Sequence, residues 1–362
     1  MKLICNFSTI GSRSTGLGVY AENCVTGLAE RFDFDIIAGS GVQPRGNVLI
    51  RAPESISIEK GRFAALRRYL WTRSLRFDSD CLVYSPTHHG LHNQTGQIIT
   101  VHDIIHLRFP ARYRIYAYFR FVLPRLLKKC RSVFTVSEAS RQDIARAYGY
   151  PLERIFVVPN GVDIANFRPD PSARLPDPFL LMVGGRHPHK NVIEALDMAQ
   201  HWKQNYRLII TSCDKGPYRQ ILERKVRDLG LVGRVEFKEY LTSEELLRLY
   251  QGASALVFPS RMEGFGIPPL EALACGTPAI VSDIPAHREV LGEAALFVKL
   301  GDSQSWARAI RSLADSSIVD AHLAVAQTRL SKFTWSNAVD ALERALLSVE
   351  PSIENLRRKS VD

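Results

Sequence analysis

The sequence predicts an α/β protein built from two doubly wound parallel-sheet domains that face a cleft. Three observations support this fold class. The chain has 362 residues, which suits two domains of about 150 to 190 residues each. Short apolar runs rich in β-branched residues alternate with longer helical patterns, as expected for parallel strands covered by helices on both faces. A turn-rich and proline-dense stretch over residues 160–176 interrupts both patterns near the middle of the chain.

The apolar runs form two series of expected strands. In the first half these are Leu3–Phe7, Asp35–Ala38, Leu82–Tyr84, Ile98–Val101, Val133–Val136 and Ile155–Val158. In the second half they are Phe179–Val183, Leu208–Thr211, Val235–Phe237, Ala255–Phe258, Ala279–Ser282 and Leu296–Val298. In open parallel sheets, ligands bind at the carboxyl ends of the strands. The residues that follow these runs are therefore the first candidates for a site.

We divide the chain into an N-terminal domain over residues 1–165, a C-terminal domain over residues 166–335, and a C-terminal helix and tail over residues 336–362. The stretch Ser336–Val349 has an amphipathic helical pattern. We expect it to pack back toward the N-terminal domain. The polar tail Glu350–Asp362 is expected to fray.

Composition excludes several classes of protein. Hydrophobic residues make up 46% of the chain and charged residues 23%, and no apolar run approaches the roughly 20 residues that span a bilayer. The N-terminus lacks the features of a signal peptide, so we expect a cytoplasmic protein. The six cysteines show no Cys-x-x-Cys spacing, which favours buried thiols in a reducing compartment over a zinc or redox site.

The most informative segment is Phe258–Ala272, where an expected strand is followed by a turn and a helix. Glu263 and Glu271 stand at either end of the turn region, and Gly264 and Gly266 lie between them. Glycines allow close approach of the backbone and present free amides to an anion at the helix N-terminus. The two carboxylates can hold sugar hydroxyls on one side and ribose hydroxyls on the other.

This segment resembles the signature of glycosyltransferase family 4, whose members are retaining enzymes with the fold called GT-B. The resemblance continues through Ala274–Ala279, Ser282–Pro285 and Glu289–Val290, and it recurs from Val101 to Asp163. It covers nearly the whole chain. It implies that the N-terminal domain lies on the acceptor side and that the C-terminal domain binds a nucleotide sugar.

The resemblance also implies roles for single residues. The residue matching Glu263 contacts hydroxyls of the donor sugar and is the first catalytic candidate, while the residue matching Glu271 binds the nucleotide ribose. Gly264, Phe265 and Gly266 complete the donor-binding turn. Similarity to enzymes of bacterial surface-polysaccharide assembly makes GDP-mannose the first expected donor. A glycan or a lipid-linked molecule is the expected acceptor.

A second turn of the C-terminal domain lies within Met182–Asn191. Lys190 would place a point charge on the donor diphosphate, as a catalytic and donor-binding residue; the alternative is an ordinary lysine at a helix start. Family members usually carry an arginine directly after the Val-Gly pair or directly before the lysine. This chain has Gly185 and His189 there. Arg186 is a candidate replacement, with an unrelated surface arginine as the alternative.

The N-terminal domain also offers candidate residues after its strands. Gly16 and Gly18 match the family's glycine loop, which lies against the donor phosphates, although a lone Gly-x-Gly is weak support by itself. His102 matches the histidine near the transferred sugar and is the third catalytic candidate. Ser137 and Glu138 either cap a helix or meet the acceptor, and the sequence leaves both possibilities open.

The net charge of +10 is concentrated in the first half of the chain. Residues before 166 include 22 Lys and Arg against 13 Asp and Glu, whereas the rest include 25 against 24. Much of the excess lies in Gly61–Phe77 and Arg112–Arg131, where arginines alternate with aromatic and aliphatic residues. Such stretches suit an anionic membrane surface or a phosphorylated acceptor, with Arg67 and Arg68 as weak acceptor-side candidates. The alternative is a solvated helix face, and no nucleic-acid motif accompanies the charge.

No metal site and no cofactor are expected. Asp33 and Asp35 have the spacing of metal-binding carboxylates but lie at the start of an expected strand, away from its ligand-binding end. The histidines of the first half lack a companion carboxylate pattern; they are His88, His89, His92, His102 and His106. Without a metal, Lys190 and the glycine turns must stabilise the leaving diphosphate.

Two other functions remain open at this point. A nucleotide-sugar 2-epimerase shares the two-domain architecture but consumes no acceptor. A carbohydrate- or nucleic-acid-binding module without catalysis would account for the basic first half but not for the pair Glu263 and Glu271. The expected enzyme is cytoplasmic and peripheral at the inner face of the cytoplasmic membrane.

Overall fold

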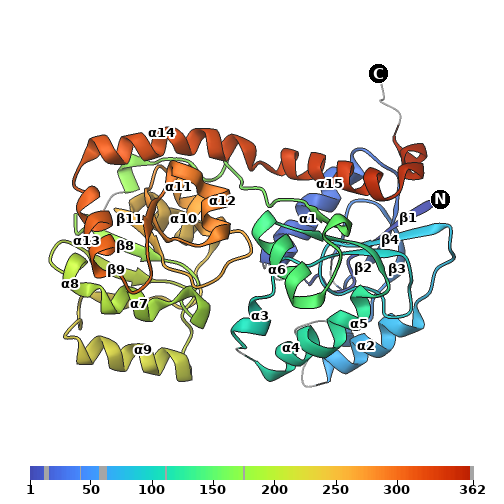
Figure 1. The fold of residues 1–362 in the computed structure, drawn as a ribbon, viewed down its shortest axis with the longest axis horizontal. Helices are drawn as coiled ribbons and strands as arrows, with labels where there is room; N and C mark the ends of the chain where they lie inside the picture. Colours follow the sequence, from blue (N-terminus) through green and yellow to red (C-terminus); the bar gives the residue numbers. More distant parts are fainter. Residues whose placement is uncertain (12–15, 41, 57–62, 111, 174–175, 359–362) are drawn as a thin grey trace. The chain divides into compact units, whose positions relative to one another are not determined.

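The computed structural model describes the chain except residues 12–15, 41, 57–62, 111, 174–175 and 359–362. The chain forms two compact units (Figure 1). Unit 1 comprises Met1–Leu107, Arg112–Gly161 and Trp335–Asp362, and unit 2 comprises Arg108–Ala111 and Val162–Thr334. The main boundaries therefore fall after Gly161 and after Thr334. The boundaries expected from the sequence are after residues 165 and 335.

Unit 1 contains a seven-stranded parallel sheet with the order β3-β2-β1-β4-β5-β6-β7. Its strands are β1 (Lys2–Asn6), β2 (Asp35–Ala38), β3 (Asn47–Arg51), β4 (Cys81–Ser85), β5 (Gln97–Thr100), β6 (Cys130–Thr135) and β7 (Ile155–Val157). Its helices are α1 (Gly16–Ala29), α2 (Ala64–Ser74), α3 (Ile105–Arg108), α4 (Tyr113–Ala117), the π-helical turn η2 (Tyr118–Val122), α5 (Leu123–Leu127), α6 (Glu138–Tyr148) and α15 (Trp335–Val349). The central strands are buried on both faces, and Ile4, Ile37 and Val83 form part of one core cluster.

Strand β3 is the one strand of the described sheet that the sequence analysis does not predict. It lies at the edge of the sheet and pairs only with β2, through a register shift between Ile36 and Ile37. Val48 and Leu49 are exposed. An edge strand with solvent on both sides carries no continuous buried pattern, which is the pattern used to find the other strands.

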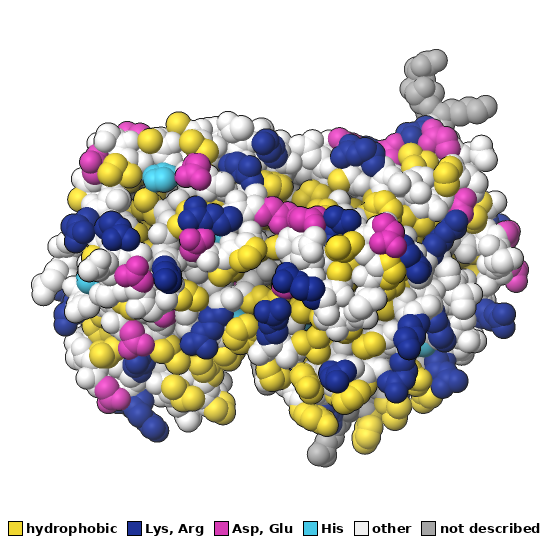
Figure 2. All heavy atoms as spheres, in the orientation of Figure 1, with side chains coloured by type: hydrophobic (Ala, Val, Ile, Leu, Met, Phe, Trp, Pro, Cys, Tyr) yellow, Lys and Arg dark blue, Asp and Glu magenta, His cyan; other side chains and the backbone are white. Residues whose placement is uncertain are grey.

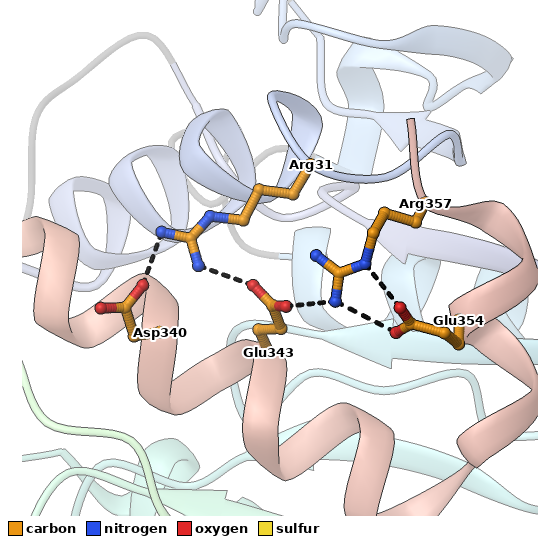
Figure 3. Close-up of polar contacts among 5 residues, drawn as sticks. All are labelled: Arg31, Asp340, Glu343, Glu354 and Arg357. Carbon is orange, nitrogen blue, oxygen red and sulfur yellow. Dashed lines mark hydrogen bonds and ion pairs between the residues drawn. The ribbon is translucent and has the colours of Figure 1, made fainter. Parts of the chain in front are cut away.

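The C-terminal segment packs within unit 1, and Figure 3 shows the ion pairs that hold it. Arg31, in the turn just after α1, pairs with Asp340 at 2.6 Å and Glu343 at 2.6 Å, and Glu343 also pairs with Arg357 at 2.6 Å. Helix α15 lies against α1. Its buried positions follow the amphipathic pattern of the sequence.

The expectation that the tail frays from residue 350 onward is wrong for the described part. Pro351–Leu356 forms the 3-10 helix η7, and Ile353 is fully buried. The backbone of Arg357 forms an isolated antiparallel β-bridge with the backbone of Phe32, and the side chain of Arg358 pairs with Asp33 at 2.8 Å. A buried side chain and several ion pairs outweigh the polar composition that suggested fraying. Residues 359–362 lie outside the described residues.

Unit 2 contains a six-stranded parallel sheet with the order β10-β9-β8-β11-β12-β13. Its strands are β8 (Phe179–Met182), β9 (Arg207–Ile210), β10 (Val235–Phe237), β11 (Ala255–Phe258), β12 (Ala279–Ser282) and β13 (Leu296–Val298). Its helices are α7 (Val192–Asp197), α8 (Ala199–Trp202), α9 (Pro217–Asp228), α10 (Ser243–Gly252), α11 (Ile267–Ala274), α12 (Pro285–Leu291), α13 (Ser303–Ser312) and α14 (Ser316–Lys332). The two parallel sheets confirm the predicted Rossmann-like fold class.

All six cysteines are free thiols, and all but Cys81 are buried. Burial raises the pKa of the Cys24 and Cys275 thiols to about 12. These thiols therefore behave as small apolar groups at neutral pH. Within the described ranges, no helix combines the length and the apolar character needed to cross a membrane.

Candidate active site

The central candidate residues of unit 2 come together because two neighbouring parallel strands end at the same edge of the sheet. β8 is followed by the turn that holds Lys190, and β11 by the turn that holds Glu263. Although 73 positions separate them, the Nζ of Lys190 donates a hydrogen bond to the Oε1 of Glu263 over 2.8 Å. The contact follows from strand adjacency, as the rule for parallel sheets requires.

The ion pair between Lys190 and Glu263 is largely shielded from water. The side chain of Lys190 is 14% exposed and that of Glu263 is 7% exposed. The ammonium group also lies 4.3 Å from the ring centroid of Phe258, in a cation–π contact. Burial alone would raise the pKa of Glu263, but Lys190 and the neighbouring His189 and His287 hold that pKa below its ordinary value. Glu263 is therefore a carboxylate at neutral pH.

Glu271 lies on α11 in a different electrostatic environment. Its Oε2 accepts a hydrogen bond of 2.6 Å from the hydroxyl of Tyr250, a fully buried side chain of α10. Burial raises the pKa of Glu271, and the Tyr250 hydrogen bond and the charge of Lys190 only partly oppose this. The carboxyl group is thus fixed in position by a neutral donor, and its charge is not neutralised by an adjacent cation.

The turn before α11 depends on a glycine and a histidine. Gly266 has a φ of +93°, and a Cβ at this position would lie 3.2 Å from the ring of His287. The Nδ1 of His287 lies 2.9 Å from the carbonyl oxygen of Ser282. Because a carbonyl can only accept, Nδ1 carries the proton and donates. His287 is fully buried and supports the turn that carries Glu263.

In unit 1, His102 lies directly after β5. Its Nε2 is 3.3 Å from the carbonyl oxygen of Pro86, and its ring meets Tyr20 of α1 edge to face, with centroids 4.6 Å apart. Gly16 and Gly18 form the first turn of α1, so Tyr20 connects the glycine loop to His102. Burial lowers the pKa of His102 to about 4, which makes the ring neutral at pH 7.

Comparison with known proteins decides the family. Residues 163–328 match the family described as glycosyl transferases group 1, and residues 14–166 match Glycosyltransferase Family 4. The chain is 35% identical to the O-antigen chain mannosyltransferase RfbU of Salmonella typhimurium, over 86% of this chain and 90% of that protein. This chain belongs to glycosyltransferase family 4.

Further similarities agree with this assignment. The glycosyltransferase is 28% identical to O-antigen chain mannosyltransferase B of Escherichia coli, over 78% of each chain. It shares its fold with sucrose-phosphate synthase from Thermosynechococcus elongatus, with a TM-score of 0.72, 19% identity and coverage of 97% and 100% of the two chains. Anabaena HepE in complex with UDP and glucose gives a TM-score of 0.72 at 18% identity, with coverage of 96% and 100%. The fold is therefore GT-B.

Some donor-side candidates of this glycosyltransferase lie apart from the ion pair. Arg186 is exposed; its Nε donates to His187 over 3.1 Å and its Nη1 pairs with Asp214 at 3.4 Å. Phe265 is buried, and its ring packs edge-on against Phe333. Any contact between Phe265 and the donor must therefore come from its backbone. The structure does not bring Arg186 into the cluster of Lys190.

The weak acceptor-side candidates take part in local structure. Ser137 is fully buried and caps α6 by accepting from the Ser140 amide, and Glu138 pairs with Arg141. These contacts correspond to the helix-capping role, one of the two possibilities that the sequence leaves open for Ser137 and Glu138. The Nε of Arg67 donates to the Ser55 carbonyl over 2.9 Å, and Arg68 donates from Nε and Nη2 to the Ile56 carbonyl. Burial lowers the pKa of Arg68. These guanidinium groups therefore brace the chain segment before α2.

The carboxylates with metal-like spacing have structural partners. Asp33 pairs with Arg358, and Asp35 accepts a hydrogen bond of 2.6 Å from the Asn47 side chain. In the part of the chain that the structure describes, no group of three or more His, Cys, Asp and Glu side chains is arranged to hold a metal ion.

Three residues that support the candidate side chains and the turn before α11 were not predicted from the sequence. Tyr250 positions Glu271, Phe258 lies beneath Lys190, and His287 supports Gly266. Phe258 was visible as the last residue of a strand beside the motif, which could have suggested its position. Tyr250 and His287 gave no such signal, because their contacts depend on how α10 and α12 pack around β11.

Proposed function

We propose that this glycosyltransferase transfers a sugar from a nucleotide sugar, with GDP-mannose as the first candidate, to a glycan or lipid-linked acceptor in polysaccharide biosynthesis. The observation that carries the proposal is the largely buried contact between Lys190 and Glu263, in the turn that leads into α11, the helix that carries Glu271. The names of the two O-antigen mannosyltransferases among its relatives support mannose and a surface polysaccharide.

In the proposed reaction, the bond between the anomeric carbon and the diphosphate oxygen breaks, and the acceptor oxygen bonds to the same carbon. The acceptor proton passes to the leaving phosphate on the same face of the sugar, which gives retention. Lys190 and the backbone N–H groups of the turn that ends at Gly266 stabilise the negative charge of the diphosphate, because Pro268 and Pro269 in the first turn of α11 have no N–H to donate. No protein nucleophile is needed in this scheme.

The two glutamates divide the donor between them. Glu263, held as a carboxylate by Lys190, accepts hydrogen bonds from hydroxyls of the transferred sugar. Glu271, positioned by Tyr250, accepts from the ribose hydroxyls. Lys190 is paired with Glu263, and because its ammonium group has three N–H donors it can donate to the carboxylate and to a phosphate at the same time. His102 is proposed to contact the sugar as a neutral ring.

We also propose that transfer needs no metal ion, because Lys190 and the backbone N–H groups of the turn that ends at Gly266 supply positive charge to the leaving diphosphate. Transfer measured in excess EDTA should match transfer with magnesium or manganese. Loss of activity in EDTA that manganese restores would contradict this part of the proposal.

The proposal includes contact with an anionic membrane surface on the cytoplasmic side, where a lipid-linked acceptor would be presented. Its support is the concentration of Lys and Arg before residue 166 and their position on the helices of unit 1. Figure 2 shows Lys and Arg side chains gathered over α2 and α5. Screening by salt should weaken such a contact.

The experiment that tests the function is a thermal-shift screen of nucleotide sugars, followed by transfer assays with the donor that stabilises the protein most. A ligand at 100 times its Kd stabilises the folded state by about 2.7 kcal/mol, which a melting curve detects. Stabilisation by GDP-mannose and acceptor-dependent release of GDP are expected. Conversion of the donor to its 2-epimer without an acceptor would identify an epimerase instead, and binding without turnover would leave a binding module.

A further inference from the structure

A basic pocket lies on unit 1 between α2 and α5. It has a volume of about 410 Å³, and its lining includes Tyr69 and Arg73 of α2, His92 and Asn93 of the loop before β5, and Arg125 and Lys129 at α5 and just after it. None of the described residues that line it carries a carboxylate. The basic segments Gly61–Phe77 and Arg112–Arg131 are visible in the sequence. That residues of both segments line one pocket depends on the tertiary fold.

The three cations of this pocket have no carboxylate partner among the described residues. Arg73 donates to the hydroxyl of Tyr69 over 3.4 Å, Arg125 donates to the carbonyl of Phe121, and Lys129 donates to the carbonyl of His92. These neutral acceptors orient the side chains without neutralising them. Three positive charges therefore remain at one concave site.

His92 shows the effect of these charges on a group inside the pocket. Burial and the nearby charges of Lys129 and Arg73 lower its pKa to about 4. Burial is the larger cause of this shift, and the smaller contribution of Lys129 and Arg73 reflects their positive charges beside the ring. His92 is neutral at pH 7 and adds no charge of its own.

Exposed apolar side chains flank the cations on both helices. Leu66, Leu70 and Arg73 are spaced i, i+4 and i+7, so they share one face of α2. Leu66 is 54% exposed, Leu70 is 57% exposed, and Phe121, one turn before Arg125, is 50% exposed. Figure 2 shows hydrophobic side chains beside the Lys and Arg side chains of this region. A surface with this pairing is complementary to an amphiphile with an anionic head.

We infer that this pocket binds the phosphate of an anionic phospholipid, with Leu66, Leu70 and Phe121 entering the apolar layer beside it. The two guanidinium groups match the oxygens of a phosphodiester in a bidentate manner, and Lys129 adds a point charge. The inference deepens the membrane contact proposed above and rests on it. It assigns the contact to Arg73, Arg125 and Lys129, whereas Arg68 is committed to the Ile56 carbonyl.

The test compares two triple variants of the full chain that remove the same charge. The pocket variant is Arg73→Gln, Arg125→Gln and Lys129→Gln. The matched control is Arg224→Gln, Arg227→Gln and Arg234→Gln, at exposed positions of unit 2. Vesicles of phosphatidylcholine, with and without phosphatidylglycerol, are the probe. A cation near an anionic surface contributes about 1 kcal/mol, so the pocket variant should bind phosphatidylglycerol vesicles about 100-fold more weakly. The control should stay within about 3-fold of the parent.

A second variant tests the apolar flank and keeps the result interpretable if the first folds poorly. Leu66→Ser, Leu70→Ser and Phe121→Ser should weaken vesicle binding that persists at high salt, where screened charges contribute less. Urea unfolding and amide exchange of α2 report whether each variant is folded. Equal binding of phosphatidylglycerol vesicles by the folded pocket variant and the parent would overturn the inference.

Two further measurements separate the possible failures. The first is binding of inorganic phosphate. If the parent binds phosphate but not vesicles, and the pocket variant does not bind phosphate, the pocket takes a free anion. That result would also overturn the inference. Nucleotide-sugar binding and transfer to a soluble acceptor are measured apart from vesicles. A parent that binds vesicles but neither binds nor transfers a sugar disproves the proposed function and not the lipid pocket.

Discussion

Glu263 lies in the turn before α11 and Glu271 lies on α11, yet their surroundings displace their pKa values in opposite directions. Glu263 has a cation 2.8 Å away, and Glu271 has only a phenol hydroxyl at hydrogen-bonding distance. Pairs of titratable groups with divergent pKa values are typical of functional sites. The difference in environment is the basis for the separate roles proposed above, with the sugar at Glu263 and the ribose at Glu271.

The separate roles predict different defects. Glu263→Gln should lower turnover by about 10²-fold, because it removes a charge-assisted contact to the reacting sugar worth about 2–4 kcal/mol in the transition state. It should leave the affinity for the free nucleoside diphosphate unchanged or higher, since Lys190 loses a competing partner. Glu271→Gln should weaken the free nucleotide by about 1.5–3 kcal/mol. Initial rates and calorimetric titration of both variants measure these effects. Weaker nucleotide binding by Glu263→Gln alone would reverse the assignment.

The same two substitutions should change stability in opposite directions. The lowered pKa of Glu263 stabilises the folded protein above the ordinary Glu pKa of 4.5, and this contribution is lost as the pH falls through the folded-state pKa. The raised pKa of Glu271 has the opposite sign, so its ionisation destabilises the folded protein above the raised value. At pH 8 without ligand, Glu263→Gln should lower the Tm and Glu271→Gln should raise it.

Differential scanning calorimetry at pH 8 and pH 4 checks the sign. At pH 4 Glu271 is mostly protonated in both states, so the gain from Glu271→Gln should shrink toward zero. A lower Tm for Glu271→Gln at pH 8 would mean that the carboxylate is stabilised in the folded protein, contrary to its raised pKa.

At the residue scale the sequence predicted the charged members of the site better than their supports. Lys190 and Glu263 were each identified from the sequence of the turn that holds them. Their contact could not be predicted, because it requires β8 and β11 to be neighbours in the sheet. The local sequence pattern does not determine the order of strands in a sheet. Tyr250 and His287 lie in helices whose periodicity only signals burial.

Secondary-structure elements were predictable where one pattern dominated. The buried strands of both sheets are continuous apolar runs, and α15 has a clear amphipathic face. β3 lacks a buried face and was missed. The tail after α15 is polar, yet its order comes from long-range contacts of Arg358, which pairs with the Asp33 carboxylate and donates its amide to the Arg31 carbonyl. No local pattern reveals these contacts.

The packing of α15 on α1 depends on a glycine inside α1. A methyl group at Gly27 would overlap the Cγ2 of Val339, a buried residue of α15. Alanine is better than glycine in a helix by about 1 kcal/mol, but overpacking costs about 1–3 kcal/mol. Gly27→Ala should therefore lower the free energy of unfolding in the natural background. With Val339→Ala the overlap disappears, and Gly27→Ala should become neutral or stabilising.

Urea unfolding of the four proteins in this double-mutant cycle gives the coupling between the two positions. A coupling near zero would show that the helices separate without cost and that their close approach is unimportant.

For the whole molecule, unit 1 is assembled from segments at both ends of the chain. Deleting residues 335–362 removes a helix whose Ala338, Leu342 and Leu346 are buried in unit 1. A chain ending at Thr334 should show fast amide exchange in α1 and β1, while β8 and β11 of unit 2 stay protected. A chain ending at Arg358 is the control. Slow exchange of α1 in the shorter chain would show that unit 1 is complete without α15.

The interleaved order of the two units also constrains how the protein is made. A ribosome adds residues at about 5–20 per second, so most of unit 1 has emerged well before Trp335 is synthesised. Until then the face of α1 around Gly27 lacks its α15 partner, whereas the main segment of unit 2 has already been synthesised. Unit 1 is therefore the last of the two to mature, and a nascent chain that stalls before Trp335 contains all of unit 2 but an incomplete unit 1.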